Sequence, residues 1–151
     1  MAPYFFIACD IKKEGIETIS LRQLAKKAKV SQTAPYRHFQ SKDHLLIEVC
    51  LQGLSNLRDQ INAIDSKNPR TKAISAALAF IDFGLKNEKI YDLILSTISG
   101  ESTKDPLRIA LFESADYTFN NLRDRITALK KKNKSQAQLD GIKVHAFTTG
   151  L

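Results

Sequence analysis

The sequence predicts an all-α protein, and three observations support this fold class. Apolar residues recur at the three- and four-residue spacing of an amphipathic helix in nearly every segment of the 151-residue chain. Alternating runs of β-branched and aromatic residues bounded by turns, which indicate strands, are absent from the sequence. Residues that favour helix caps stand before several of the periodic segments.

Two helices are expected before residue 29. The first covers residues 4–13 and ends at Glu14-Gly15, where glycine can adopt a left-handed cap. The second is short, with Ser20 as its N-cap and its end near Ala28. Its expected buried face follows the spacing i, i+3, i+4, i+7 and consists of Leu21, Leu24, Ala25 and Ala28.

A tight connection at residues 29–31 leads to a third short helix, expected from Gln32 to Phe39. Ser41 can cap a fourth helix, which Asn68-Pro69 ends and which is long enough to connect two domains. The residues that this helix should turn inward are Leu45, Leu46, Val49, Leu54, Leu57 and Ile61.

Four further helices are expected, with a loop at residues 100–104 between the second and the third of them. The fifth helix of the chain is defined by Ile74, Ala77, Leu78, Ile81 and Leu85, and the sixth by Ile90, Leu93, Ile94 and Thr97. Asp105-Pro106 places an N-cap before a proline at the first helical position, which opens the longest helix. The residues that this seventh helix should bury are Leu111, Phe112, Ala115, Phe119, Leu122, Ile126 and Leu129. An eighth helix, cut short by the end of the chain, is indicated by Leu139, Ile142, Ala146 and Phe147.

Positive charge is denser in the N-terminal part of the chain. The net charge is +7, and residues 1–47 hold eight Lys/Arg against four Asp/Glu, whereas residues 48–151 hold fifteen against twelve. A compact basic region favours a polyanionic partner, although a solvated charged face gives the same composition.

The cysteines and the apolar runs indicate where the protein works. Cys9 and Cys50 lie in apolar helical patterns without a secretory signal, so we expect reduced core thiols in a cytoplasmic protein. No apolar run approaches the roughly 20 residues that cross a bilayer, so no membrane partner is expected.

The segment from Ile16 to Leu46 points to function. Two short helices joined by a three-residue turn, in a basic region, are what a helix-turn-helix needs, because the first helix braces the second against the major groove. The segment reads IETISLRQLAKKAKVSQTAPYRHFQSKDHLL and resembles the DNA-binding signature of the TetR (tetracycline-repressor-like) family of bacterial regulators. The resemblance covers about a fifth of the chain and rests on the bracing helix, the Val30-Ser31 turn, residues 36–39, and Lys42 with the leucines that follow.

The resemblance implies an architecture and a function. It implies a helix-turn-helix domain at residues 1–47 and a helical ligand-binding and dimerisation domain at residues 48–151. The expected function is that of a ligand-responsive repressor, which binds a palindromic operator in double-stranded DNA as a homodimer. The expected ligand is a small apolar or amphipathic molecule, and no cofactor is implied.

The candidate DNA-binding residues divide into base readers and phosphate contacts. The full set is Arg22, Gln32, Thr33, Ala34, Tyr36, Arg37, His38 and Lys42. Gln32, Thr33 and Ala34 occupy the first turn of the reading helix, where amide and methyl groups can reach base edges. The Tyr36 hydroxyl can reach a phosphate, although a core tyrosine is the simpler alternative. Lys42 opposes the dipole of the helix it begins, which favours an outside anion.

The same segment departs from the family pattern in three ways. Lys29 stands where the family usually has glycine, so either the turn avoids positive φ or it holds about 1 kcal/mol of strain. Pro35 removes a backbone donor one turn into the reading helix and leaves the Ser31 carbonyl to another partner, or shifts the helix start. The basic residues that usually precede the first helix, and the usual last helix, are not visible in the sequence.

Candidate ligand-binding residues lie in the C-terminal part. They are Phe80, Phe83, Leu95, Ile98, Phe112 and Phe119, and the alternative is that they simply fill a core. An enzyme is not expected, because His38, His44 and His145 lack metal-ligand spacing and the sequence has no nucleophile elbow or phosphate-cradling glycine loop. The remaining alternative is a basic helical adaptor that binds protein or RNA without operator specificity.

Overall fold

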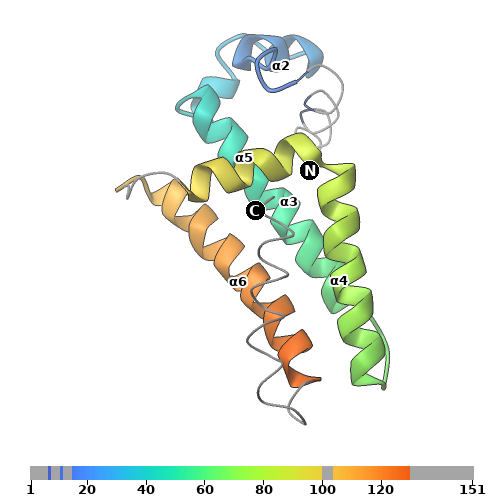
Figure 1. Cartoon of the computed structure of the whole chain (residues 1–151). Coiled ribbons are helices and arrows are strands. Elements are labelled where there is room, and N and C mark those ends of the chain that lie inside the picture. Colours follow the sequence, from blue (N-terminus) through green and yellow to red (C-terminus); the bar gives the residue numbers. More distant parts are fainter. Residues whose placement is uncertain (1–6, 8–10, 12–14, 100–103, 130–151) are drawn as a thin grey trace.

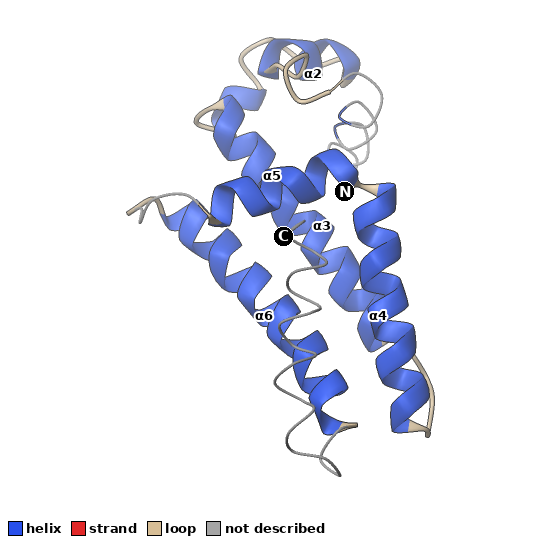
Figure 2. Cartoon of the chain, in the orientation of Figure 1, coloured by secondary structure: helices blue, strands red, loops and turns tan. Residues whose placement is uncertain are grey.

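Every element in the described part of the chain is helical, which confirms the predicted fold class (Figures 1 and 2). The computed structural model describes residues 7, 11, 15–99 and 104–129. Its elements are α2 (Leu21–Lys27), the short 3₁₀-helix η1 (Pro35–Arg37), α3 (Lys42–Asn62), α4 (Pro69–Lys86), α5 (Glu88–Ile98) and α6 (Pro106–Ala128). The expected first helix lies mostly outside the described residues, but Ile7 and Ile11 are helical and buried. The expected eighth helix lies wholly outside them.

The predicted capping residues begin their helices. Ser20 Oγ accepts a hydrogen bond from a first-turn backbone N–H of α2, and Ser41 Oγ does the same at α3, each at 3.1 Å. Asp105 Oδ1 accepts from the Leu107 N–H at 2.9 Å and caps α6. These bonds satisfy amide groups that have no partner inside the helix, so the helix starts are fixed locally.

The long helix α3 connects a small N-terminal head, which contains α2 and η1, to a body formed by α4, α5 and α6 around its other end (Figure 1). The expected inward residues of α3 are all buried. They belong to one apolar core that also includes Leu24 of the head and Ile90, Ile94 and Leu111 of the body. Full burial of one such side chain stabilises the fold by about 1.5–3 kcal/mol, so this shared core ties the base of the head to the body.

The structure corrects the expected face of α4. The predicted residues Ile74, Leu78, Ile81 and Leu85 are 47–79% exposed, while the helix buries Ala73, Ala76, Phe80 and Phe83. The helix therefore has two apolar stripes, and the spacing of apolar residues alone does not decide between them. The stripe that faces the core combines two alanines with two aromatic rings, so small side chains allow a close helix approach and the rings fill the space beside it.

Three other inward predictions are wrong. Phe112 on α6 is 55% exposed, Leu129 just beyond its end is 37% exposed, and Ala28 at the C-cap of α2 is also exposed. The buried stripe of α6 instead includes Thr118, which is 1% exposed. Its hydroxyl donates to the Ser114 carbonyl at 2.7 Å, so a polar residue occupies the core at little cost.

Candidate nucleic-acid interface

The turn after α2 sets the direction of the chain that follows it. The N–H of Val30 donates to the Ala25 carbonyl at 3.0 Å, and the N–H of Lys29 donates to the Lys26 carbonyl at 3.2 Å. This pair of bonds is a Schellman motif, which requires a left-handed residue after the C-cap. Lys29 is this left-handed residue, with φ of +54°. The sequence left open whether the turn avoids positive φ or holds strain, and the structure shows the strained conformation.

The reading segment, residues 32–39, is not the α-helix that was expected. Residues 32–34 form successive turns and η1 is a single 3₁₀ turn. The cause is Pro35, which has no N–H to donate to the Ser31 carbonyl. That carbonyl accepts instead from the Ala34 N–H at 3.0 Å, three residues on, and the His38 N–H donates to the Pro35 carbonyl in the same pattern.

Most candidate DNA-binding side chains are exposed on this segment. Gln32, Thr33, Arg37 and His38 are exposed, whereas Ala34 is half-buried. Tyr36 is 60% exposed, which excludes the core-tyrosine alternative. Pro35 is buried and anchors the segment between these exposed neighbours.

Lys42 has a partner inside the protein. It is half-buried, and its Nζ donates to the Glu17 carbonyl at 3.2 Å, a bond across 25 residues. This bond ties the loop before α2 to the first turn of α3. An internal acceptor therefore accounts for a cation at this helix start, and the argument from the helix dipole to an outside anion no longer holds.

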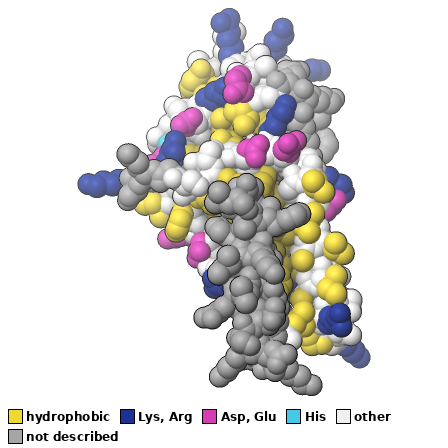
Figure 3. All heavy atoms as spheres, viewed as in Figure 1, with side chains coloured by type: hydrophobic (Ala, Val, Ile, Leu, Met, Phe, Trp, Pro, Cys, Tyr) yellow, Lys and Arg dark blue, Asp and Glu magenta, His cyan; other side chains and the backbone are white. Residues whose placement is uncertain are grey.

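The head presents a basic surface. Arg22, Lys26, Lys27 and Lys29 are exposed on α2 and its turn, and Arg37 is exposed on the reading segment. Figure 3 shows Lys and Arg side chains projecting at the head end, around α2. Sequence reasoning selected Arg22 and Arg37 and missed the three lysines, although the same helical spacing would have placed them on the outer face. The surface is suited to a polyanion.

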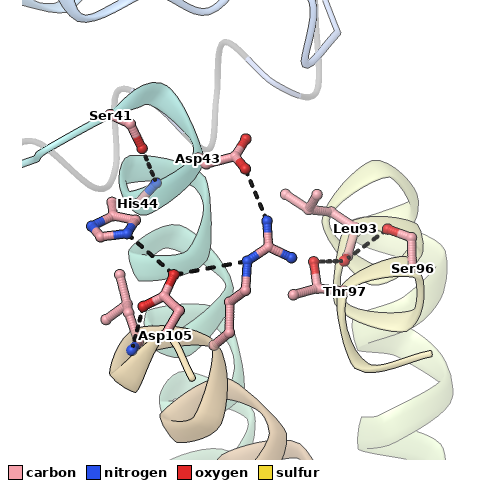
Figure 4. Close-up of polar contacts among 9 residues, drawn as sticks. Ser41, Asp43, His44, Leu93, Ser96, Thr97 and Asp105 are labelled. Carbon is pink, nitrogen blue, oxygen red and sulfur yellow. Dashed lines mark hydrogen bonds and ion pairs between the residues drawn. The ribbon is translucent and has the colours of Figure 1, made fainter. Parts of the chain in front are cut away.

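Sequence reasoning also missed a polar cluster where the head meets the body (Figure 4). Asp43 Oδ2 pairs with Arg108 Nη2 at 2.9 Å, and His44 Nε2 lies 3.2 Å from Asp105 Oδ2. Arg108 Nε lies 3.8 Å from the same Asp105 oxygen. The hydrogen bond from the Leu107 N–H, followed by the electrostatic attraction of His44, lowers the pKa of the Asp105 carboxyl. The partners are 61 and 65 residues apart in the chain, so no local pattern could have revealed them.

The candidate ligand-binding residues are placed differently from one another. Phe80 and Phe83 are buried, and Leu95, Ile98 and Phe119 are half-buried, while Phe112 points away from them on the exposed side of α6. The Phe80 ring packs on Phe119 with centroids 5.3 Å apart and edge-on to Tyr91 at 6.2 Å. These contacts favour the alternative that the aromatic rings fill a core.

In the part of the chain that the structure describes, no cluster of His, Cys, Asp and Glu has the arrangement of a metal site. No helix there combines the length and the hydropathy needed to cross a membrane.

Comparisons with known proteins agree with this geometry. Residues 11–49 match the model of the bacterial regulatory proteins of the tetR family. The chain is 27% identical over 93 residues to YobS, an uncharacterised HTH-type transcriptional regulator of Bacillus subtilis (strain 168), a match that covers 61% of this chain and 49% of YobS. The chain thus spans about half the length of this curated relative.

Solved structures show the same fold. The TetR-family transcriptional regulator PfmR of Thermus thermophilus is similar with a TM-score of 0.72 and 22% identity, over 99% of this chain and 83% of that one. A TetR-family regulator from Bordetella parapertussis 12822 has a TM-score of 0.65 and 17% identity, over 97% of this chain and 80% of its own. All three of these proteins are transcriptional regulators. Residues 11–49 are thus similar to the DNA-binding segment of the tetR-family regulatory proteins, and the whole chain shares the fold of solved regulators of that family.

Proposed function

We propose that this protein is a DNA-binding transcriptional regulator that reads a near-palindromic operator as a dimer. One observation carries the proposal: an exposed reading segment, bounded by the Schellman turn and α3, lies beside exposed Lys and Arg side chains on one head. Phosphate contacts from the basic residues would position the head, and side chains of residues 32–34 would read base edges. A single short segment touches too few bases for specificity, so two heads on successive major grooves are expected.

The division of roles within the head is part of the proposal. Arg22 and Arg37 are assigned to phosphates, together with the hydroxyl of Tyr36 and the ring of His38. Gln32, Thr33 and Ala34 are assigned to bases. Thr33 Oγ1 lies 3.2 Å from Ser31 Oγ, so its hydroxyl is oriented by a neighbour and its methyl group is the better candidate for a thymine methyl. Lys42 is retained as a phosphate contact with its remaining donors, because an ammonium has three and one is used by Glu17.

The test is a selection of binding duplexes from a random pool, followed by salt titration on the enriched sequence. A regulator should enrich a near-palindrome, and log affinity should fall steeply with log salt because phosphate contacts release counterions. Arg37→Ala should weaken selected and random duplexes alike and reduce the salt slope by about one. Gln32→Ala should weaken only the selected duplex, by about 1–3 kcal/mol, and leave the slope unchanged.

Two outcomes would contradict the proposal. A pool that yields no preferred duplex, together with equal binding of RNA, would support the helical adaptor instead. A monomer by sedimentation that binds the enriched duplex with full affinity would refute the dimer.

Ligand-responsive repression and a cytoplasmic location are the finer parts of the proposal. An apolar or amphipathic molecule among α4, α5 and α6 would lower DNA affinity by favouring a spacing of the heads that misfits the grooves. The Phe80 and Phe119 rings pack directly on each other, so a ligand there must separate them. Linkage gives the check: the factor by which a ligand weakens DNA binding must equal the factor by which DNA weakens ligand binding.

A further inference from the structure

We propose that Asp43, His44, Asp105 and Arg108 are positioning residues, which hold the reading segment in its DNA-binding orientation without contacting DNA. We call these four side chains the junction cluster. The inference rests on the proposed function, because it concerns the orientation in which the head meets a duplex.

The first observation is the position of the cluster. Asp43 and His44 belong to the first turn of α3, directly after the reading segment, whereas Asp105 caps α6 and Arg108 lies in its first turn. Figure 4 shows the side chains from the two helices turned toward each other. The His44 and Asp105 side chains are only 25% and 24% exposed, so this contact is partly shielded from solvent. The cluster therefore links the end of the head to a helix of the body.

The second observation is electrostatic. The N-termini of α3 and α6 lie close together at the cluster, because side chains of their first turns pair with each other, and each N-terminus carries a partial positive charge from its unpaired amide groups. Two like-signed helix ends repel. The carboxylates of Asp43 and Asp105 stand between them, Asp43 on the guanidinium of Arg108 and Asp105 on the ring of His44. Removing either carboxylate charge breaks an ion pair between the two helices and leaves the repulsion between the helix ends uncompensated.

The third observation is a pocket beside this cluster, between the end of the reading segment and the start of α6. A pocket of about 350 Å³ separates His38, Phe39 and Gln40 at the end of the segment from Pro106 and Leu107 at the start of α6. α2 and η1 pack chiefly against each other. The shared apolar core holds the base of the head to the body, and at this side of the junction the polar contacts of the cluster supply the link.

The experiment combines DNA binding with a distance measurement. Arg108→Ala removes both contacts of the guanidinium, and Asp105→Asn removes the charge while asparagine still caps the helix. Asp82→Asn is the matched control, because it breaks an exposed ion pair of 2.9 Å with Lys86 that lies within α4. Spin labels at Ala28→Cys on the head and Gln60→Cys on α3, both exposed positions, report the head angle in a Cys9→Ser background diluted with unlabelled protein.

The expected result is a loss of DNA affinity without a change in the number of phosphate contacts. Arg108→Ala and Asp105→Asn should bind the duplex selected with the parent protein about three- to tenfold more weakly, with an unchanged salt slope. Their label distances should broaden, and circular dichroism should show the same helix content. Asp82→Asn should match the parent protein in both measurements.

Two results would overturn the inference. One is a distance distribution in Arg108→Ala as narrow as in the parent, and the other is a broadened distribution with full affinity. The distance measurement needs no DNA, so it judges the junction cluster even if no preferred duplex exists. In that case the proposed function fails on the selection experiment, and the two failures remain distinguishable.

Discussion

Replacing Lys29 with glycine should stabilise the protein, because a lysine here occupies a backbone conformation that glycine adopts without a steric penalty. Lys29 has φ of +54° and is held there by the two bonds of the Schellman motif, so it cannot relax without breaking them. A left-handed residue other than glycine costs about 1–2 kcal/mol. Glycine returns part of this gain through the greater entropy of its unfolded chain, about 0.5–1 kcal/mol. The net expectation is a gain of about 0.5–1 kcal/mol.

The matched control is Lys29→Ala, which removes the same charge and keeps the strain. Urea or thermal unfolding should find Lys29→Gly about 0.5–1 kcal/mol more stable than Lys29→Ala, with a melting temperature about 1–4 °C higher. Because both variants lose one cation, they should bind random duplex equally well. If Lys29→Gly were no more stable than Lys29→Ala, the assignment of strain to this turn would be wrong.

Three other predictions follow from burial and from shifted pKa values. Burial raises the pKa of the Cys50 thiol to about 12, so iodoacetamide at pH 8 should leave Cys50 unmodified until urea unfolds the protein, and peptide mass spectrometry that finds rapid native modification would contradict this. Chiefly through the Leu107 amide, folding lowers the pKa of Asp105, so its stabilisation is present above the ordinary carboxyl range and is lost as pH falls through the lowered value. As pH falls from 6 to 3, the free energy of unfolding should therefore fall more steeply for the parent than for Asp105→Asn. An equal pH dependence in the two proteins would refute this prediction. Leu57→Ala should cost about 2–5 kcal/mol because Leu57 is 0% exposed, whereas Leu85→Ala, at a position 79% exposed, should stay within about 0.5 kcal/mol in urea unfolding.

Local chemistry explains which parts of the fold the sequence predicts. Ser20, Ser41 and Asp105 mark helix starts because each cap bonds an amide two or three residues away. Pro35 predicts a disturbance of the reading helix for the same reason. Its result, a single 3₁₀ turn, also depends on how the buried proline ring packs, and that is not a local property.

Features set by tertiary packing could not be predicted in this way. The two apolar stripes of α4 have the same helical spacing, so only the neighbouring helices decide which of them is buried. Phe112 and Thr118 lie on the same helix, yet the apolar Phe112 is exposed and the polar Thr118 is buried. The position of Lys42 at a helix start predicts an outside anion, whereas its partner is the carbonyl of Glu17 in an earlier loop.

The length of α3 has a mechanical consequence for reading DNA. The helix has 21 residues without a break, and at about 1.5 Å per residue it is a rod of roughly 30 Å with the head at one end. A tilt of about 5° at its far end moves the head end by nearly 3 Å, which is about the whole length of a hydrogen bond to a base edge. A shift too small to disturb the packing of the body is therefore magnified at the head into one that base recognition does not tolerate.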